Sequence, residues 1–152
     1  MITKPDSTAN AVDFCMSVSQ AHASLNLKLD MELGTYHGLS LADFALLRLL
    51  SRAADGRMAV RDLVRPLGLQ QSAVMRQLIL LEKTGRVQRE AAPSADGQRQ
   101  VAIRPGGRRL FNEALETAQQ VCGDAVAPLH MDRLPLVDAA LSTLCHSRAL
   151  AL

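Results

Sequence analysis

The hydrophobic pattern changes period partway along the middle of the chain, and this change restricts the fold more than any other feature. Residues 61–67 have the spacing of a short helix, which Pro66 either ends early or strains in its last turn. Gly68 then allows a tight turn. A second helix is predicted from Gln70 or Gln71 to Thr84. This part of the chain therefore begins as helix, turn and helix.

A β-hairpin is predicted directly after these two helices. The stretches RVQREA and RQVAIR alternate in period two, and APSADGQ between them contains the turn residues Pro93, Asp96 and Gly97. Further helices are predicted on both sides, over residues 10–34, from the Ser40 cap to Arg52, from Gly107 through Val121 and over 134–146. The expected fold class is mainly α with a small β-hairpin wing, in the order of a winged helix-turn-helix.

The composition favours one intracellular domain with an appended helical part. The chain has 152 residues, of which 48% are apolar, and its apolar runs are far shorter than the roughly 20 residues of a membrane span. The N-terminus lacks the apolar core of a signal peptide, so we expect a soluble cytoplasmic protein without membrane contact.

The cysteines and histidines indicate neither a disulfide framework nor a metal site. Three widely spaced cysteines without a C-x-x-C pair are expected to be small buried residues, and the four histidines form no pair at i, i+4 spacing. No nucleophile with a matching base is evident, and PGGRR is too short for a phosphate loop. We therefore expect no metal, no cofactor and no enzymatic activity.

Positive charge is concentrated in the middle of the chain. Residues 57–109 contain eleven cations, ten of them arginine, against four anions, although the whole chain carries a net charge of only +2. The flanking segments are therefore acidic. Such a cluster of arginines points towards phosphate groups, which attract it through charge and counterion release.

The helix predicted to follow Gly68 has a polar leading edge. Val74, Leu78 and Leu81 share one face and are expected to pack inward. The remaining face at the N-terminal end, together with the residue before it, gives the predicted DNA contacts Gln70, Gln71, Ser72, Met75 and Arg76. Glutamine and arginine can make paired hydrogen bonds to adenine and guanine edges in the major groove. An ordinary amphipathic helix with a solvated face is the alternative.

The stretch LSLADFALLRLLSRAADGRMAVRDLVRPLGLQQSAVMRQLILLEKTGRV, followed by a charged turn and GRRLFNEAL, resembles the core of MarR-type transcriptional regulators. The resemblance covers about residues 39–115. It implies a homodimer that binds operator DNA, with the terminal helices of both subunits interdigitated and often an effector pocket nearby. It also implies an N-terminal dimerisation part (1–36), a DNA-binding domain (37–106) and C-terminal dimerisation helices (107–152). A partner surface is independently suggested by the apolar segment PLVDAALSTLCHSRALAL.

The wing departs from the family pattern. The usual Asp-x-Arg is stretched by one residue between Asp96 and Arg99, Ile103 and Arg104 replace Leu-Thr, and Gly107 matches the glycine that follows. The resemblance makes Arg99 the wing arginine that contacts the minor groove or phosphates. Arg86 and Lys83 are expected to contact the DNA backbone or to be surface charges.

Three interpretations of the function are open, and the first two differ in the signal that a regulator of this type senses. Cys15 and Cys122 resemble, in position, the sensing cysteines of the organic-hydroperoxide (OhrR) branch, although that branch places tyrosines beside the thiol and this chain has only Tyr36. Alternatively, a small anionic or aromatic effector binds near Cys15, His22, Tyr36, His37 and Arg48 and releases a repressor. A third interpretation is a winged-helix module that binds a protein and no DNA.

Overall fold

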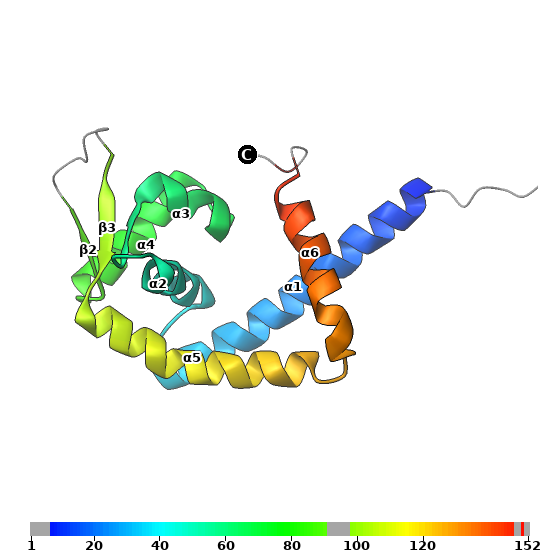
Figure 1. Cartoon of the computed structure of the whole chain (residues 1–152). Coiled ribbons are helices and arrows are strands. Elements are labelled where there is room, and N and C mark those ends of the chain that lie inside the picture. Colours follow the sequence, from blue (N-terminus) through cyan, green and yellow to red (C-terminus); the bar gives the residue numbers. More distant parts are fainter. Residues whose placement is uncertain (1–6, 91–97, 148–149, 151–152) are drawn as a thin grey trace, which may run out of the picture. The chain divides into compact units, whose positions relative to one another are not determined.

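The structure is a computed structural model that describes residues 7–90, 98–147 and 150, with side chains described from Asn10 onward (Figure 1). The chain divides into two compact units, Met1–Ala118 and Gln119–Leu152. Helices dominate the described residues and accompany one small antiparallel sheet, so the predicted fold class is confirmed.

The first helix, α1, spans Ser7–His37 and is longer than predicted. The predicted end at residue 34 is wrong, because Gly34, Tyr36 and His37 continue the helix. The helix ends at Gly38, whose φ of 62° is a conformation that favours glycine. Glycine within a helix lowers its stability only modestly, so Gly34 does not stop a helix whose neighbouring Leu33 is fully buried.

The next three helices confirm the predicted helix-turn-helix. They are α2 (Leu41–Arg52), α3 (Val60–Leu67) and α4 (Gln71–Lys83). The Ser40 hydroxyl accepts the backbone amide of Asp43 at 3.0 Å, which caps α2 as expected. Pro66 lies inside the last turn of α3, and the helix still reaches Leu67.

The turn between α3 and α4 is set by Gly68. Gly68 has a φ of 62°, and the amides of Gly68 and Leu69 donate to the carbonyls of Arg65 and Val64. This pattern of bonds is a Schellman motif, which ends α3 and redirects the chain into α4.

Among the described residues, three strands form one sheet in the order β1-β3-β2. The predicted hairpin is β2 (Val87–Arg89) paired with β3 (Gln100–Ile103), and its turn, including Pro93, Asp96 and Gly97, lies outside the described residues. The sequence did not predict β1 (Arg57–Ala59), which pairs antiparallel with β3 through Met58 opposite Val101. Three residues are too few to show a period, and β1 exists because β3 offers it hydrogen bonds.

The core of the first unit lies between α2, α3, α4 and the sheet. Val74, Leu78 and Leu81 of α4 are buried, which confirms the predicted inward face. The Phe44 and Phe111 rings meet at 5.3 Å between centroids and join α2 to α5. The other fully buried large side chains are Leu33, Leu46, Leu47, Leu50, Leu63, Val87 and Val101.

The C-terminal helices begin with α5 (Pro105–Val126), followed by a 3-10 turn at Met131–Arg133 and α6 (Leu134–Cys145). Both predicted helices are therefore present, and α5 begins two residues earlier than expected. Across the described part of the chain, none of the helices combines the length and the apolar character needed to cross a membrane.

Candidate nucleic-acid interface

The N-terminal end of α4 presents polar side chains to solvent. Gln70, Gln71, Ser72 and Arg76 are exposed, whereas Met75 is half-buried between them and the core. Gln70 stands at the N-cap, and its side chain makes no capping hydrogen bond. Arg76 forms no ion pair with any residue in the described ranges. The burial of Val74 and Leu78 on the opposite side fixes which face of α4 points outward.

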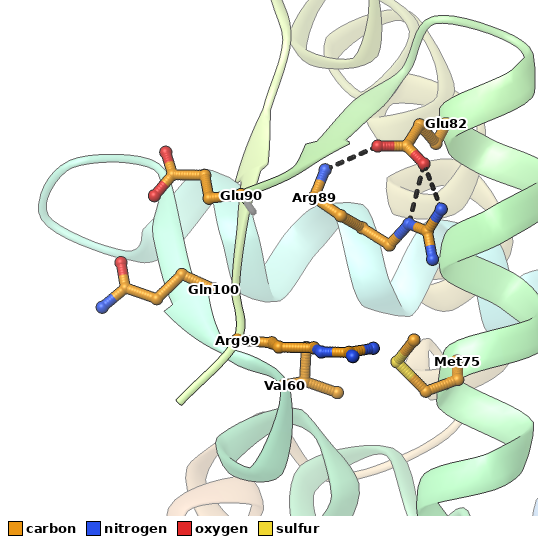
Figure 2. A pocket seen from close by; sticks show the side chains of 7 residues that line it. All are labelled: Val60, Met75, Glu82, Arg89, Glu90, Arg99 and Gln100. Atoms are coloured by element: carbon orange, nitrogen blue, oxygen red, sulfur yellow. Dashed lines mark hydrogen bonds and ion pairs between the residues drawn. The ribbon is translucent and has the colours of Figure 1, made fainter. Parts of the chain in front are cut away.

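The wing places a second exposed arginine beside this face. Arg99 lies just before β3, and its carbonyl oxygen accepts the backbone amide of Val60 at 3.0 Å. Its side chain extends towards the thioether of Met75 (Figure 2). Arg99 and Met75 line two neighbouring cavities, of about 310 and 410 Å³, and the second is also lined by Gln71 and Arg61. Gln71 and the wing residue Arg99 thus border one hollow.

The carboxylate of Glu82 joins α4 to the wing. Its Oε1 accepts the backbone amide of Arg89 at 2.8 Å, and its Oε2 accepts Nε and Nη2 of the same arginine at 2.7 and 2.6 Å (Figure 2). These hydrogen bonds, the backbone bond first, hold the pKa of Glu82 below its ordinary value of 4.5, and the charge of Arg104 adds to the effect. The sequence pattern does not predict this pair, because its contact depends on how the hairpin returns to α4.

A second ion pair ties the end of β2 to β1. Nε of Arg57 donates to Oε1 of Glu90 at 2.8 Å. Glu90 lines the smaller of the two cavities together with Glu82 and Arg99. Both acidic side chains of this cavity are therefore held by an arginine other than Arg99.

Arg86 lies at the opposite end of α4 from Gln71, roughly 20 Å away along the helix axis. It is half-buried, and its Nη1 donates to the carbonyl oxygen of Gly106 at 3.4 Å. Its own carbonyl oxygen accepts the amide of Arg104 at 2.9 Å. Arg86 thus connects the start of β2 to the start of α5 and lies away from the polar leading edge of α4.

The predicted effector residues do not gather at one place. Cys15 and His22 are exposed on α1, roughly 32 Å and 22 Å along the helix from Tyr36 and His37 respectively. Tyr36 is 70% exposed on the last turn. Arg48 is exposed on α2. One small ligand cannot reach both ends of α1 within one chain.

His37 is the exception among these residues. Its Nε2 lies 2.8 Å from Oγ1 of Thr117, so it joins the end of α1 to α5. It also lines a cavity of about 150 Å³ that it shares with Leu80 and Arg86. The sequence did not predict this cavity, because its walls come from the four helices α1, α2, α4 and α5 and from two loops.

The cysteines were expected to be buried, and this expectation is wrong. Cys15, Cys122 and Cys145 are free and exposed, on α1, α5 and α6 respectively. Within the described residues, no group of three or more histidine, cysteine or acidic side chains is placed to hold a metal ion.

Comparison with known proteins gives matches at the level of structure. No protein-family model matches the sequence, and no curated protein sequence matches it. A MarR family transcriptional regulator from Rhodococcus sp. RHA1 is similar with a TM-score of 0.79 at 18% identity, over 90% of this chain and 94% of that one. Sco3205 from Streptomyces coelicolor, a MarR family regulator solved in complex with DNA, is similar with a TM-score of 0.79 at 20% identity, over 90% and 86%.

A third solved structure was determined with a small molecule. CouR from Rhodococcus jostii RHA1, bound to p-coumaroyl-CoA, is similar with a TM-score of 0.79 at 18% identity, over 89% of this chain and 93% of that one. At identities this low, the structural likeness establishes the fold alone. The element order, the wing and these likenesses agree, and the chain therefore has the winged helix fold of MarR family transcriptional regulators.

Proposed function

We propose that this chain is a DNA-binding transcriptional regulator of the MarR type. The observation that carries the proposal is the shared hollow lined by Gln71, Arg61 and Arg99, which puts the leading edge of α4 and the wing on one face. A recognition helix in the major groove with an adjacent wing arginine fits this face. The similarity to a regulator solved in complex with DNA supports the same conclusion.

The exposed residues of this face have distinct proposed roles. Gln70, Gln71 and Arg76 offer the donors that read base edges, Ser72 suits bases or phosphates, and Met75 offers apolar contact to a thymine methyl group. Arg99 contacts the minor groove or phosphates. Lys83 and Arg86 contribute phosphate contacts or surface charge, and the bond from Arg86 to Gly106 favours a supporting part for Arg86.

The active form is a homodimer in this proposal. Residues 1–36 and 107–152 form the dimerisation region, and residues 37–106 form the DNA-binding domain. Two sets of exposed apolar side chains support this division. On α1 they are Val12, Phe14, Met16, Leu25, Leu27 and Met31. In the second unit they are Leu129, Met131, Leu136, Val137, Leu141 and Leu150.

The regulator acts as a repressor that a small anionic or aromatic effector releases. The p-coumaroyl-CoA bound to CouR supports an aromatic acid or its thioester as the class. Within this chain, His37 beside Thr117 is the polar group best placed to respond, since it joins α1 to α5. Peroxide sensing at the exposed Cys15, with Cys122 as its resolving partner, is the competing mechanism.

The test is binding of the purified protein to DNA from upstream of its own gene, at two salt concentrations, with and without cumene hydroperoxide. Tight, sequence-preferring binding that weakens steeply with salt is the expected result. Release by the peroxide, reversed by a thiol reductant and lost in Cys15→Ser, would establish the redox mechanism in place of a small-molecule effector. No affinity for any duplex, even at low salt, would reject DNA binding and favour a protein partner.

A further inference from the structure

Arg99 has no ion-pair partner among the described residues, although two carboxylates line the same cavity. Glu82, Glu90 and Arg99 all border the cavity of about 310 Å³, yet within the described ranges the Arg99 guanidinium forms no hydrogen bond or ion pair. Opposite charges in one hollow normally pair, and Glu82 and Glu90 already have other partners. Arg89 holds Glu82, and Arg57 holds Glu90.

The contact between Arg89 and Glu82 has two separable parts. The backbone amide of residue 89 donates to Oε1 of Glu82, and the guanidinium of Arg89 occupies Oε2. A change of the Arg89 side chain leaves the backbone bond in place, so β2 stays attached to α4. Such a change frees Oε2 alone, in a cavity whose remaining unpaired cation is Arg99. In Figure 2 the Arg89 side chain lies between Glu82 and Arg99.

We propose that Arg89 is a positioning residue, which occupies the Glu82 carboxylate and thereby leaves Arg99 available to the phosphates of bound DNA. This inference rests on the proposed function. Without Arg89, the freed Glu82 oxygen captures the Arg99 guanidinium, and the DNA-facing hollow has one positive charge fewer. Both effects weaken binding, and removal of the Glu82 charge reverses both.

The experiment compares four variants with the wild type on a mixed-sequence duplex, from about 50 mM to about 200 mM salt. Arg99→Gln should weaken binding roughly tenfold at 0.1 M salt and lower the salt slope by about 0.9, the value of one phosphate contact. Arg89→Gln should lose about the same affinity and slope. The double variant Glu82→Gln/Arg89→Gln should return to within about twofold of the wild type, and Glu82→Gln alone should bind at least as well as the wild type.

These outcomes separate capture of Arg99 from other uses of Arg89. A double variant as weak as Arg89→Gln would make Arg89 itself a DNA contact and overturn the proposal. Loss of affinity in Glu82→Gln would instead make the bridge a structural support. Wild-type binding in Arg89→Gln would also overturn the proposal, because Arg104 or water would then be the partner of the freed Glu82 oxygen. Wild-type binding in Arg99→Gln would overturn it as well, because Arg99 would then make no contact with DNA.

Thermal unfolding of each variant checks that the fold is kept. If Arg89→Gln does not fold, Arg89→Lys keeps a cation beside Glu82 and is expected to bind like the wild type, whereas a tenfold loss would overturn the proposal. If the wild type has no affinity for duplex at about 50 mM salt, the proposed function itself fails, which is a separate result.

Discussion

At the scale of the single residue, Gly107 is the glycine with the least room for a side chain among those in the described ranges. A Cβ at this residue would overlap the carbonyl oxygen of Arg86 and lie 3.0 Å from its carbonyl carbon. Both obstacles are backbone atoms, so they cannot turn away. We expect Gly107→Ala to reduce the free energy of unfolding by about 1–3 kcal/mol. Urea unfolding measures this, and Gly123→Ala is the matched control in the same helix.

The control should behave in the opposite way. No atom of the described residues lies within 4 Å of a Cβ at Gly123, and alanine favours helix by up to about 1 kcal/mol over glycine. Gly123→Ala should therefore leave stability unchanged or raise it. Equal stability of the two alanine variants would show that the approach of α5 to Arg86 is not a constraint on the fold.

Arg76 is the residue on which base recognition can be tested most directly. It is exposed on α4 without an ion pair among the described residues. If it reads a guanine, Arg76→Ala should cost about 1–3 kcal/mol on a cognate operator and relax preference at one base pair. Lys83→Ala, at the other end of the same helix, removes at most a phosphate contact and should weaken binding about uniformly across sequences. Equal losses in the two variants would assign Arg76 to phosphates.

At the scale of the elements, the Glu82 bridge between α4 and β2 makes stability depend on pH. The pKa of Glu82 is lowered in the fold, so its carboxylate binds protons less readily than in the unfolded chain. Its contribution is therefore complete above the ordinary value of 4.5 and is lost as the pH falls through the folded pKa. Wild type should be more stable than Glu82→Gln at pH 7, and the difference should shrink below pH 4.5. A difference that stays constant with pH would show that the charge of Glu82 contributes nothing.

The elements also show how far the sequence reaches. The buried stripe of Val74, Leu78 and Leu81, the Ser40 cap and the turn at Gly68 all follow from local pattern, and each was predictable. In contrast, β1 and the Glu82–Arg89 bridge depend on where distant segments meet, which one sequence does not reveal. For the same reason, Cys15 was expected to be buried. An apolar helix face has the same sequence pattern whether it packs within its own chain or against another chain.

At the scale of the whole molecule, the exposed apolar residues predict a dimer. Leu136 of α6 is 74% exposed, and a glutamate there would place a charge in the proposed interface. Light scattering should give the wild type twice the 16.4 kDa of one chain and Leu136→Glu the mass of one. Leu80→Glu is the matched control, because Leu80 is 62% exposed on α4 within the proposed DNA-binding domain.

The proposed dimer also bears on the proposed mode of DNA binding. In a dimer, two recognition helices related by a two-fold axis bind two half-sites. Loss of dimerisation therefore removes half of the DNA contacts at once. Leu136→Glu should therefore lose most of its operator affinity while its α4 and wing remain intact by circular dichroism. A monomeric wild type, or a monomeric Leu136→Glu that binds the operator as tightly as the wild type, would show that each winged helix acts alone. The exposed apolar residues of α1 and α6 would then have to meet a different protein.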